Sequence, residues 1–293
     1  MGKAALGDRR TYIGGSDIGA ILGVSPWCSP LQLYMRKIGA TPEQPDSPHL
    51  RRGRLLEPVV RQMYAEDRGI ALCGPRTLSR GGWLVGHLDD STTEPRVVEI
   101  KTASAFRREA WGDPGTDEIP LYYTAQAQFY MHLGDFPAAD IAVLIGGDDF
   151  RIYTVQADRE LQAAIIAKAQ EFWQRVRDRN PPDPTTIDDT LALYPRSIAD
   201  RAIVADAAIA SDVAIVAAQQ EAIDRCTNAL DAAKVRIQAR MGDAAAVVRD
   251  GSILCTWKSQ ERRTVDVKEL RRAQPDIADE FERVTRTRVF RVK

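Results

Sequence analysis

Three charged residues have the types and the spacing of a metal-dependent hydrolytic site. Glu99 and Lys101 lie two positions apart in the segment VVEIKT, and because alternate side chains of a strand share a face, both project the same way. Asp89 ends the preceding strand-like run, so two carboxylates meet where two strands diverge. Carboxylate oxygens suit a hard divalent cation, and the backbone carbonyl of Ile100 can add a further oxygen ligand between them.

The chemistry that this set predicts is hydrolysis of a phosphodiester, since magnesium keeps several waters and binds phosphate readily. Lys101 lies beside the same water, where its ammonium can orient the nucleophile or stabilise developing charge. Asp90 is a competing ligand, but strand alternation puts it on the opposite face, so Asp89 is preferred. A structural alternative stays open, because Glu-x-Lys on a strand also occurs as a solvated edge or an ion pair.

The elements that must position these residues are short strands and helices. Strand-like runs fall at 82–90, 96–102, 139–147 and 150–156. Apolar residues at helical spacing predict a helix around 55–63, which carries Glu57, and others over 120–134 and 161–176. A further helix follows a glycine-rich turn with Ser16 as its N-cap. This order predicts an α/β core with a mixed central sheet flanked by helices.

The last third of the chain has a different pattern. The run NPPDP at 180–184 predicts a boundary between a core of residues 1–183 and an extension of residues 184–293. Residues 200–241 contain neither proline nor glycine, and a seven-residue apolar repeat predicts one long helix that packs on another helix of this chain or of a neighbouring subunit. Beyond it, SILCTWKS and RTVDV predict a small β element, and the arginine-rich end suits DNA, a partner protein or a plain exposed edge.

Composition excludes several classes of protein. The 293 residues are 44% apolar and 28% charged, which is ordinary for a globular chain. With 40 basic and 41 acidic residues, nucleic-acid binding must rest on local patches. No apolar run is long enough for a membrane span, and the segment MGKAALGDRR lacks a signal core, so export is not expected. The four cysteines are far apart, which argues against a zinc or iron–sulfur site and fits a reducing cytosol.

Five ordered segments resemble the PD-(D/E)xK nuclease superfamily and, within it, the YqaJ-type viral recombinase family, which is phage lambda exonuclease-like. The segments are IGGSDIGAILGVSPW (13–27), RRGRLLEPVV (51–60), GHLDD (86–90), VVEIKT (97–102) and PLYYTAQAQFYMHLG (120–134), within roughly residues 9–180. The resemblance implies a restriction-endonuclease-like fold for the core. One departure is that Leu88 precedes Asp89 where the family motif usually has proline.

The resemblance also implies roles for the residues of the candidate site. Asp89, Glu99 and the Ile100 carbonyl would hold the catalytic Mg²⁺ or Mn²⁺. Glu57 would contribute to the metal site, through water or a second ion. Lys101 would be the catalytic lysine.

Further residues would bind or orient DNA. Gln126 would orient the active site or the scissile phosphate. Ser16 and Arg9 would bind a terminal 5′-phosphate, with Arg10 as the substitute for Arg9 if the register differs by one; a helix start also suits an anion on physical grounds. Three arginines before the Glu57 helix are candidates for contacts with DNA phosphates, a solvated face being the alternative. They are Arg51, Arg52 and Arg54. His87 is interpreted as a structural group.

The function that the resemblance implies is a metal-dependent 5′–3′ exonuclease in the cytoplasm of a bacterial host cell. It would resect linear double-stranded DNA and leave 3′ overhangs for a single-strand annealing protein, as a homo-oligomer and by resemblance a trimer. Two alternatives are a structure-specific or restriction-type endonuclease of the same superfamily and a non-catalytic DNA-binding module.

Overall fold

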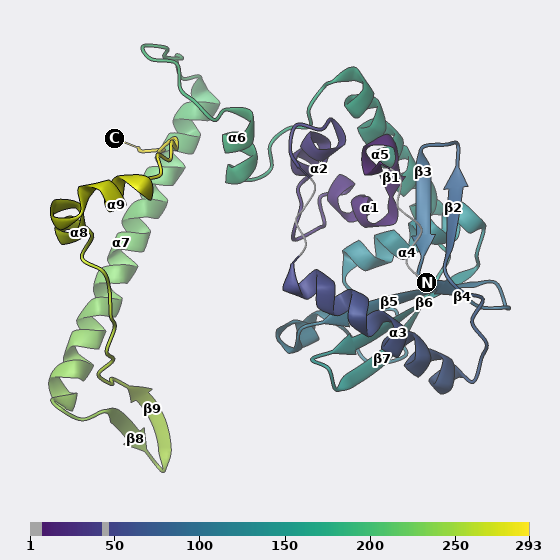
Figure 1. Ribbon diagram of the computed structural model, residues 1–293, viewed down its shortest axis with the longest axis horizontal. Helices are drawn as coiled ribbons and strands as arrows, with labels where there is room; N and C mark the ends of the chain where they lie inside the picture. The colour runs from purple at the N-terminus through teal and green to yellow at the C-terminus, as the bar shows by residue number, and fades with distance from the viewer. Residues whose placement is uncertain (1–7, 43–46, 293) are drawn as a thin grey trace. The chain divides into compact units, whose positions relative to one another are not determined.

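The chain divides into two compact units, residues 1–193 and 194–293. The computed structural model describes residues 8–42 and 47–292 (Figure 1). The boundary lies ten residues beyond the predicted 183/184, because helix α6 (Ile187–Leu193) belongs to the first unit. Asp189 of α6 is fully buried and accepts a hydrogen bond from Ser29 Oγ at 2.6 Å, which ties α6 to the start of α2 (Pro30–Lys37).

The central sheet of the first unit has four strands in the order β4-β5-β6-β7. They are β4 (Asp90–Ser91), β5 (Arg96–Ala103), β6 (Ala138–Ile145) and β7 (Asp149–Gln156). Strands β5 and β6 are parallel and the other pairs antiparallel, so the predicted mixed sheet is confirmed. Helix α4 (Leu121–Gly134) makes the crossover that a parallel pair requires.

A second sheet has the order β1-β3-β2. Its strands are β1 (Ile13–Gly14), β2 (Arg76–Arg80) and β3 (Leu84–Leu88). The strand-like run predicted at 82–90 is divided between the two sheets, because β3 pairs with β1 and β2, whereas Asp90 belongs to β4, the antiparallel partner of β5. Gly81 and Gly82 both adopt positive φ angles in the three-residue loop that joins β2 to β3, and glycine adopts such angles without steric cost.

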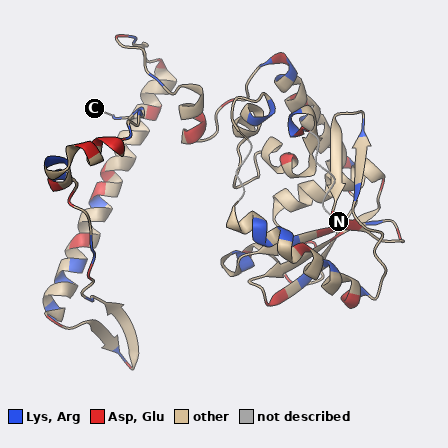
Figure 2. Cartoon of the chain, in the orientation of Figure 1, with Lys and Arg blue, Asp and Glu red and all other residues tan. Residues whose placement is uncertain are grey.

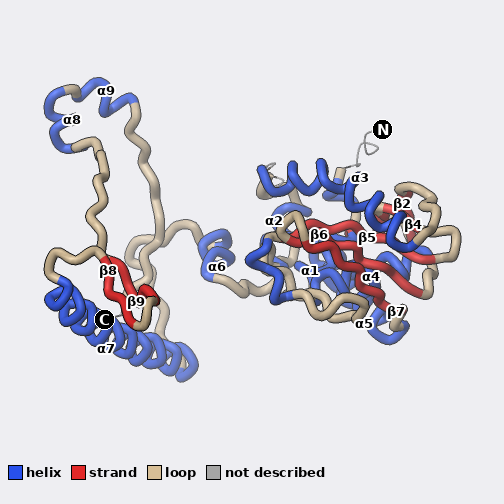
Figure 3. The backbone as a smooth tube through the Cα atoms, turned by 90° about the horizontal axis from the view of Figure 1, so that it is seen from below, coloured by secondary structure: helices blue, strands red, loops and turns tan. Residues whose placement is uncertain are grey.

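Helices cover both faces of the central sheet (Figure 3). Helices α1 (Gly15–Ile21), α4 and α5 (Arg159–Asp178) build the larger apolar cluster with one face of the sheet. Helix α3 (Pro48–Arg68) covers the other face, where Val60 and Tyr64 meet Val98 and Ile100 in a second cluster. Two short 3₁₀ turns, η1 (Arg9–Thr11) and η2 (Ala105–Ala110), complete the unit.

The second unit contains the long predicted helix as α7 (Ala207–Met241). It is followed by β8 (Ala246–Arg249), β9 (Ser252–Thr256), α8 (Val267–Ala273) and α9 (Pro275–Glu280). The predicted strand SILCT is present, but its partner is β8 rather than RTVDV. The turn between β8 and β9 contains Asp250 and Gly251, both with positive φ, a hairpin signal that the sequence interpretation overlooked. No described helix meets the length and hydrophobicity of a membrane span.

Candidate active site

Strand β5 carries the two residues at the centre of the predicted site. Its residues Val98 and Ile100 pack beneath α3, so Glu99 and Lys101 lie on the opposite face of the sheet, as the alternation predicts. The register pairs Glu99 with Ile141 and Lys101 with Val143 of β6. The positions of both side chains are therefore fixed by the pairing of β5 with β6.

The carboxylate of Glu99, which is 3% exposed, is held from two directions. Gln126 Nε2 on α4 donates to Glu99 Oε1 at 2.7 Å, and Lys101 Nζ donates to the same oxygen. Gln126 Nε2 also donates to the hydroxyl of Tyr130, one helical turn further on, at 3.1 Å. The structure therefore brings Gln126, a residue expected from the resemblance alone, into direct contact with Glu99.

Asp89 lies between β3 and β4, where the chain leaves one sheet and enters the other. Strand β4 pairs with β5 only as far as Val98, which leaves the edge of β5 beyond that residue open. Asp89 Oδ2 accepts a hydrogen bond from the Ile100 amide at 3.0 Å on this edge. Since a strand residue directs its N–H and C=O to the same side, the Ile100 carbonyl opens towards Asp89.

The charges of Glu99 and Asp89 both shift the pKa values of two neighbouring side chains, Lys101 and Tyr130. Burial alone would lower the pKa of Lys101, but the charges of Glu99 and Asp89 outweigh burial and hold that pKa above its ordinary value. Burial and the same two charges raise the pKa of the Tyr130 phenol well above its ordinary value. Lys101 Nζ also lies 5.1 Å from the centre of the Tyr123 ring. Lys101 is therefore a charged ammonium enclosed by anionic and aromatic groups.

The donor atoms at this edge fit a hard divalent cation. Two carboxylates and one backbone carbonyl supply oxygen only, and magnesium is ordinarily held by one or two carboxylates with several waters completing its octahedron. Among residues 8–42 and 47–292, no three histidine, cysteine, aspartate or glutamate side chains gather into a metal-binding group. A metal site made of Asp89, Glu99 and the Ile100 carbonyl stays a prediction.

Glu57 does not form a three-carboxylate group with Asp89 and Glu99. It lies on α3, 3.7 Å from Arg61 one turn later, and its role through water or a second ion stays a prediction. Arg61 Nη2 donates to the Asp89 carbonyl oxygen at 2.7 Å, and Arg61 Nε lies 3.3 Å from Asp90 Oδ2. The sequence interpretation overlooked Arg61, because an arginine four residues after a glutamate is typical of an exposed helical ion pair.

Asp90 and His87 are structural. Asp90 is 1% exposed, and its Oδ1 accepts hydrogen bonds from the amides of Gly74 and Ser91, both at 2.7 Å. The preference for Asp89 over Asp90 therefore agrees with the geometry. His87 has Thr77 Oγ1 at 2.9 Å from one ring nitrogen and the Tyr12 hydroxyl at 3.3 Å from the other.

The glycine-rich turn brings Arg9 and Ser16 together. Arg9 Nη2 donates to Ser16 Oγ at 2.8 Å, whereas Arg10 forms its ion pair with Asp8 at 2.6 Å. The expectation that Ser16 is an N-cap is wrong, because α1 begins at Gly15. The carboxylate of Asp17 satisfies the helix start instead, since its Oδ2 accepts from the Gly14 amide at 2.9 Å.

Lys37 of α2 fixes this turn from within. Its ammonium is buried and donates to the Arg9 and Tyr12 carbonyl oxygens at 2.7 and 2.6 Å and to Asp17 Oδ2 at 2.7 Å. Burial lowers the pKa of Lys37 in spite of the Asp17 charge. Sequence reasoning also overlooked Lys37, because a lysine in the last turn of a helix is typical of favourable dipole placement at the surface.

The arginines predicted to contact DNA phosphates occupy the first turns of α3. All three are exposed there, which suits either a phosphate contact or a solvated face: Arg51, Arg52 and Arg54.

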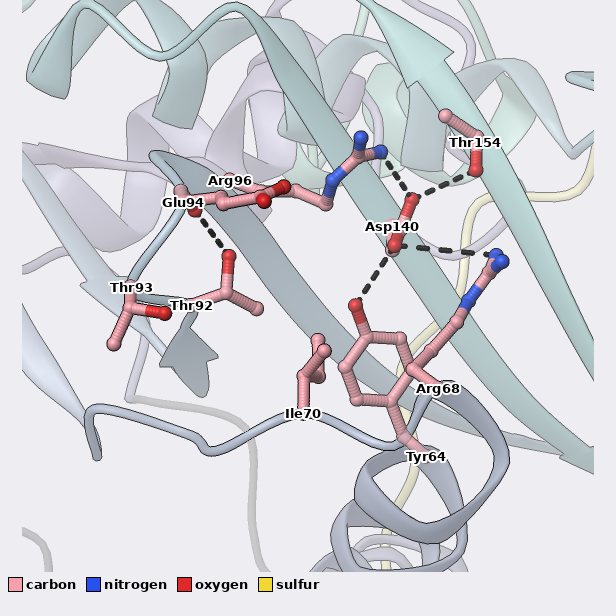
Figure 4. Close-up of a pocket in the computed structure, with 9 residues that line it drawn as sticks. All are labelled: Tyr64, Arg68, Ile70, Thr92, Thr93, Glu94, Arg96, Asp140 and Thr154. Carbon is pink, nitrogen blue, oxygen red and sulfur yellow. Dashed lines mark hydrogen bonds and ion pairs between the residues drawn. The ribbon is translucent and has the colours of Figure 1, made fainter.

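A pocket of about 300 Å³ lies on the α3 face of the sheet, the face opposite to Glu99 and Lys101 (Figure 4). At its centre Asp140 accepts hydrogen bonds from Tyr64 at 2.8 Å, Thr154 at 2.7 Å and Arg96 at 2.8 Å. Arg68 Nη2 lies 4.0 Å from the same carboxylate. Because the buried charge is matched by arginine and hydroxyl donors, we interpret this cluster as the anchor of the C-terminal turns of α3.

Comparison with known proteins finds a family match in the first part of the chain. Residues 6–137 match the family model of the YqaJ-like viral recombinase domain, which confirms the resemblance in the motifs. The chain is also 28% identical over 301 residues to the uncharacterized protein YqaJ of Bacillus subtilis (strain 168), covering 98% of this chain and 92% of that protein.

Two solved structures are similar to this chain at low sequence identity. The alkaline exonuclease LHK-Exo from Laribacter hongkongensis matches with a TM-score of 0.46 and 16% identity, over 59% of this chain and 91% of that one. A phage-related exonuclease from Haemophilus somnus 129PT matches with a TM-score of 0.41 and 15% identity, over 57% of this chain and 96% of that one.

Proposed function

We propose, on the premise that residues 6–137 of this chain form a YqaJ-like viral recombinase domain, that the protein is a metal-dependent DNA nuclease. The observation that carries the proposal is the arrangement at the edge of β5. There the Asp89 carboxylate accepts a hydrogen bond from the Ile100 amide, and the Glu99 carboxylate accepts one from Lys101. Oxygen donors beside a buried ammonium suit hydrolysis of a phosphodiester.

Two residues of the chain would have distinct roles in the hydrolysis, beside the metal ion. A bound Mg²⁺ or Mn²⁺ would activate water and neutralise phosphate charge. Lys101 would hold the attacking water and stabilise charge on the phosphoryl oxygens, because its ammonium is enclosed by two carboxylates. Gln126 would keep Glu99 in its binding orientation through the 2.7 Å hydrogen bond.

The finer proposal is that the enzyme is an exonuclease that begins at a DNA end. The Arg9 guanidinium and the Ser16 hydroxyl, 2.8 Å apart, would bind the terminal 5′-phosphate and so set a 5′–3′ direction. Resection of linear duplex would then leave a 3′ overhang for a single-strand annealing protein. A homo-oligomer, by resemblance a trimer, acting in the bacterial cytoplasm belongs to the same proposal.

The test follows labelled mononucleotides released from end-labelled linear duplex in Mg²⁺. We expect Asp89→Asn and Glu99→Gln to lower the rate at least about 100-fold, while binding of the same duplex in Ca²⁺ stays at the parental level. Glu94→Gln is the matched control, because Glu94 is an exposed carboxylate in the turn between β4 and β5, and it should digest DNA at the parental rate. Parental digestion by either site variant would place the chemistry elsewhere.

A covalently closed duplex circle separates this function from an endonuclease of the same superfamily. An exonuclease that needs an end leaves the circle intact over the time in which it consumes linear DNA. Rapid cutting of the circle would favour the endonuclease, and binding without cleavage of either substrate in Mg²⁺ or Mn²⁺ would favour a non-catalytic module.

A further inference from the structure

The second unit contains a long helix whose apolar side chains are not covered within that unit. Of the described hydrophobic side chains from Tyr194 onward, only Met241 is buried. Helix α7 has 35 residues and so extends for about 50 Å at the standard rise. A unit of this size requires an apolar core for stability, so α7 needs a partner surface.

The exposed apolar residues of α7 include a line that recurs every seven positions, here called the apolar stripe. Each member is between 38% and 58% exposed: Ile209, Val216, Ile223, Leu230 and Ile237. A seven-residue repeat drifts by only about 20° per heptad around a straight helix. The stripe therefore runs along one face for almost the whole length of α7, which is the pattern of a seam between helices.

The residues beside the stripe carry opposite charges at its two ends. Asp206 and Asp212 lie three positions from Ile209, on either side of it along the sequence. Lys234 and Arg240 take the equivalent places at the other end, four positions after Leu230 and three after Ile237. Spacings of three and four put side chains next to one another on a helix.

The whole helix has the same polarity. Residues 206–224 contain four acidic and no basic side chains, whereas residues 225–241 contain four basic and one acidic. Lysine and arginine accordingly gather on the part of α7 that leads into β8 (Figure 2).

We propose that α7 pairs antiparallel with α7 of a second copy of this chain. An antiparallel arrangement brings the acidic end of each stripe beside the basic end of the other. A parallel arrangement in register would place Asp212 beside Asp212 and Arg240 beside Arg240, and like charges along a seam are unfavourable. The charge pattern therefore selects both the occupant, a copy of the same helix, and its direction.

The stripe is symmetric about its middle member, so the two-fold axis passes near Ile223. With the axis there, Ile209 faces Ile237 of the second copy and Val216 faces Leu230 of the second copy. Such a contact is isologous, because each helix offers the same surface to the other, and it closes after two copies. It is independent of the nuclease proposal.

The first experiment measures self-association of the full chain by sedimentation equilibrium. We expect the parental protein to associate and Ile223→Asp to raise the dissociation constant by at least about tenfold. Val235→Asp is the matched control, because Val235 is 62% exposed on the side of α7 away from the stripe, and it should leave association unchanged. Circular dichroism verifies that both variants keep their helix.

The second experiment tests the direction and needs no change in the stripe. We expect Asp212→Lys and Lys234→Asp each to weaken association about threefold to tenfold, because the axis near Ile223 places Asp212 beside Lys234 of the second copy, and the double variant to restore it. A parallel pair would show no such rescue.

Two results would overturn the proposal. One is a monomeric parental chain at every concentration, which would mean that the first unit or another protein covers the stripe. The other is that the single charge variants do not weaken association or that the double variant does not restore it. This second result can be obtained even if Ile223→Asp unfolds α7.

Discussion

Adjacent arginines before the glycine-rich turn have different surroundings. Arg9 contacts Ser16 and Asp17, whereas Arg10 is held by Asp8 through both its Nε and its Nη2. Arg10 also holds the pKa of Asp8 at about 2, through hydrogen bonds and charge. Only Arg9 is thus placed to share an anion with the Ser16 hydroxyl.

This difference predicts an asymmetric effect on DNA-end preference. Ser16→Ala and Arg9→Ala should reduce the preference for 5′-phosphorylated over 5′-hydroxyl linear duplex by about tenfold, since a charge-assisted hydrogen bond is lost. Arg10→Ala is the neighbouring control and should keep the preference. The measurement is the ratio of digestion rates on the two substrates. A preference that survives in both Ser16→Ala and Arg9→Ala would locate the phosphate pocket elsewhere.

Among the elements, α1 and α4 depend on a close contact between Gly15 and Tyr130. A Cβ atom at Gly15 would lie 2.4 Å from Tyr130 Cε1, and the Tyr130 ring is buried and cannot simply turn away. Tyr130 in turn accepts a hydrogen bond from Gln126, which holds Glu99. Gly15 of the IGGSD segment is thus coupled to the candidate site through packing.

We predict that Gly15→Ala lowers the free energy of unfolding by about 1–3 kcal/mol, because the core must shift to admit the methyl group. Gly53→Ala is the matched control. Gly53 lies within α3, and its Cβ would meet Thr102 Oγ1 at an ordinary 3.6 Å. Alanine should there stabilise the protein by about 0.5–1 kcal/mol. Urea unfolding measures both, and equal effects of the two changes would contradict the packing argument.

Helix α6 is held in the first unit by the Asp189 carboxylate and by packing of Leu193 against the apolar core. Burial alone would raise the pKa of Asp189, but hydrogen bonds from Ser29, Thr185 and Thr186 outweigh burial and keep that pKa below its ordinary value. A lowered folded-state pKa stabilises the fold above the unfolded-state pKa, near 3.9, and this contribution is lost as the pH falls through the folded-state value.

Asp189→Asn should therefore cost about 1–3 kcal/mol at neutral pH and much less in acid. The check is the free energy of unfolding of parent and variant between pH 7 and pH 3. Asp188 is an exposed neighbour on the same helix, and Asp188→Asn should leave the fall in the free energy of unfolding between pH 7 and pH 3 unchanged. A constant difference between parent and Asp189→Asn across the range would exclude the ionised carboxylate as the anchor.

For the whole molecule, the division into two units predicts where the chain is cut. Residues 194–206 form no helix or strand, and Arg196 and Arg201 are exposed within them. Limited trypsin digestion should cut first at these arginines, since exposed irregular segments are the preferred sites of nicking. Arg196→Gln with Arg201→Gln should slow that cut. First cuts among the described residues before Leu193, identified by mass spectrometry, would contradict the boundary.

The sequence by itself determined the strands β5, β6 and β7, the helices α4, α5 and α7, and the group of Asp89, Glu99 and Lys101. These elements follow from local periodicity, because side chains on one face recur about every two residues in a strand and about every seven residues, or two turns, in a helix. The direction of Glu99 and Lys101 away from α3 follows from the same alternation.

Only the tertiary structure decided which segments meet. It paired β3 with β2 and β1, because the Gly81–Gly82 turn and the long-range contact with Ile13 outweigh proximity to β5. It placed Arg61 on Asp89 and Lys37 beneath the Arg9 turn, contacts between residues 28 positions apart. Such contacts depend on the packing of whole elements, and no local pattern in a single sequence encodes that packing.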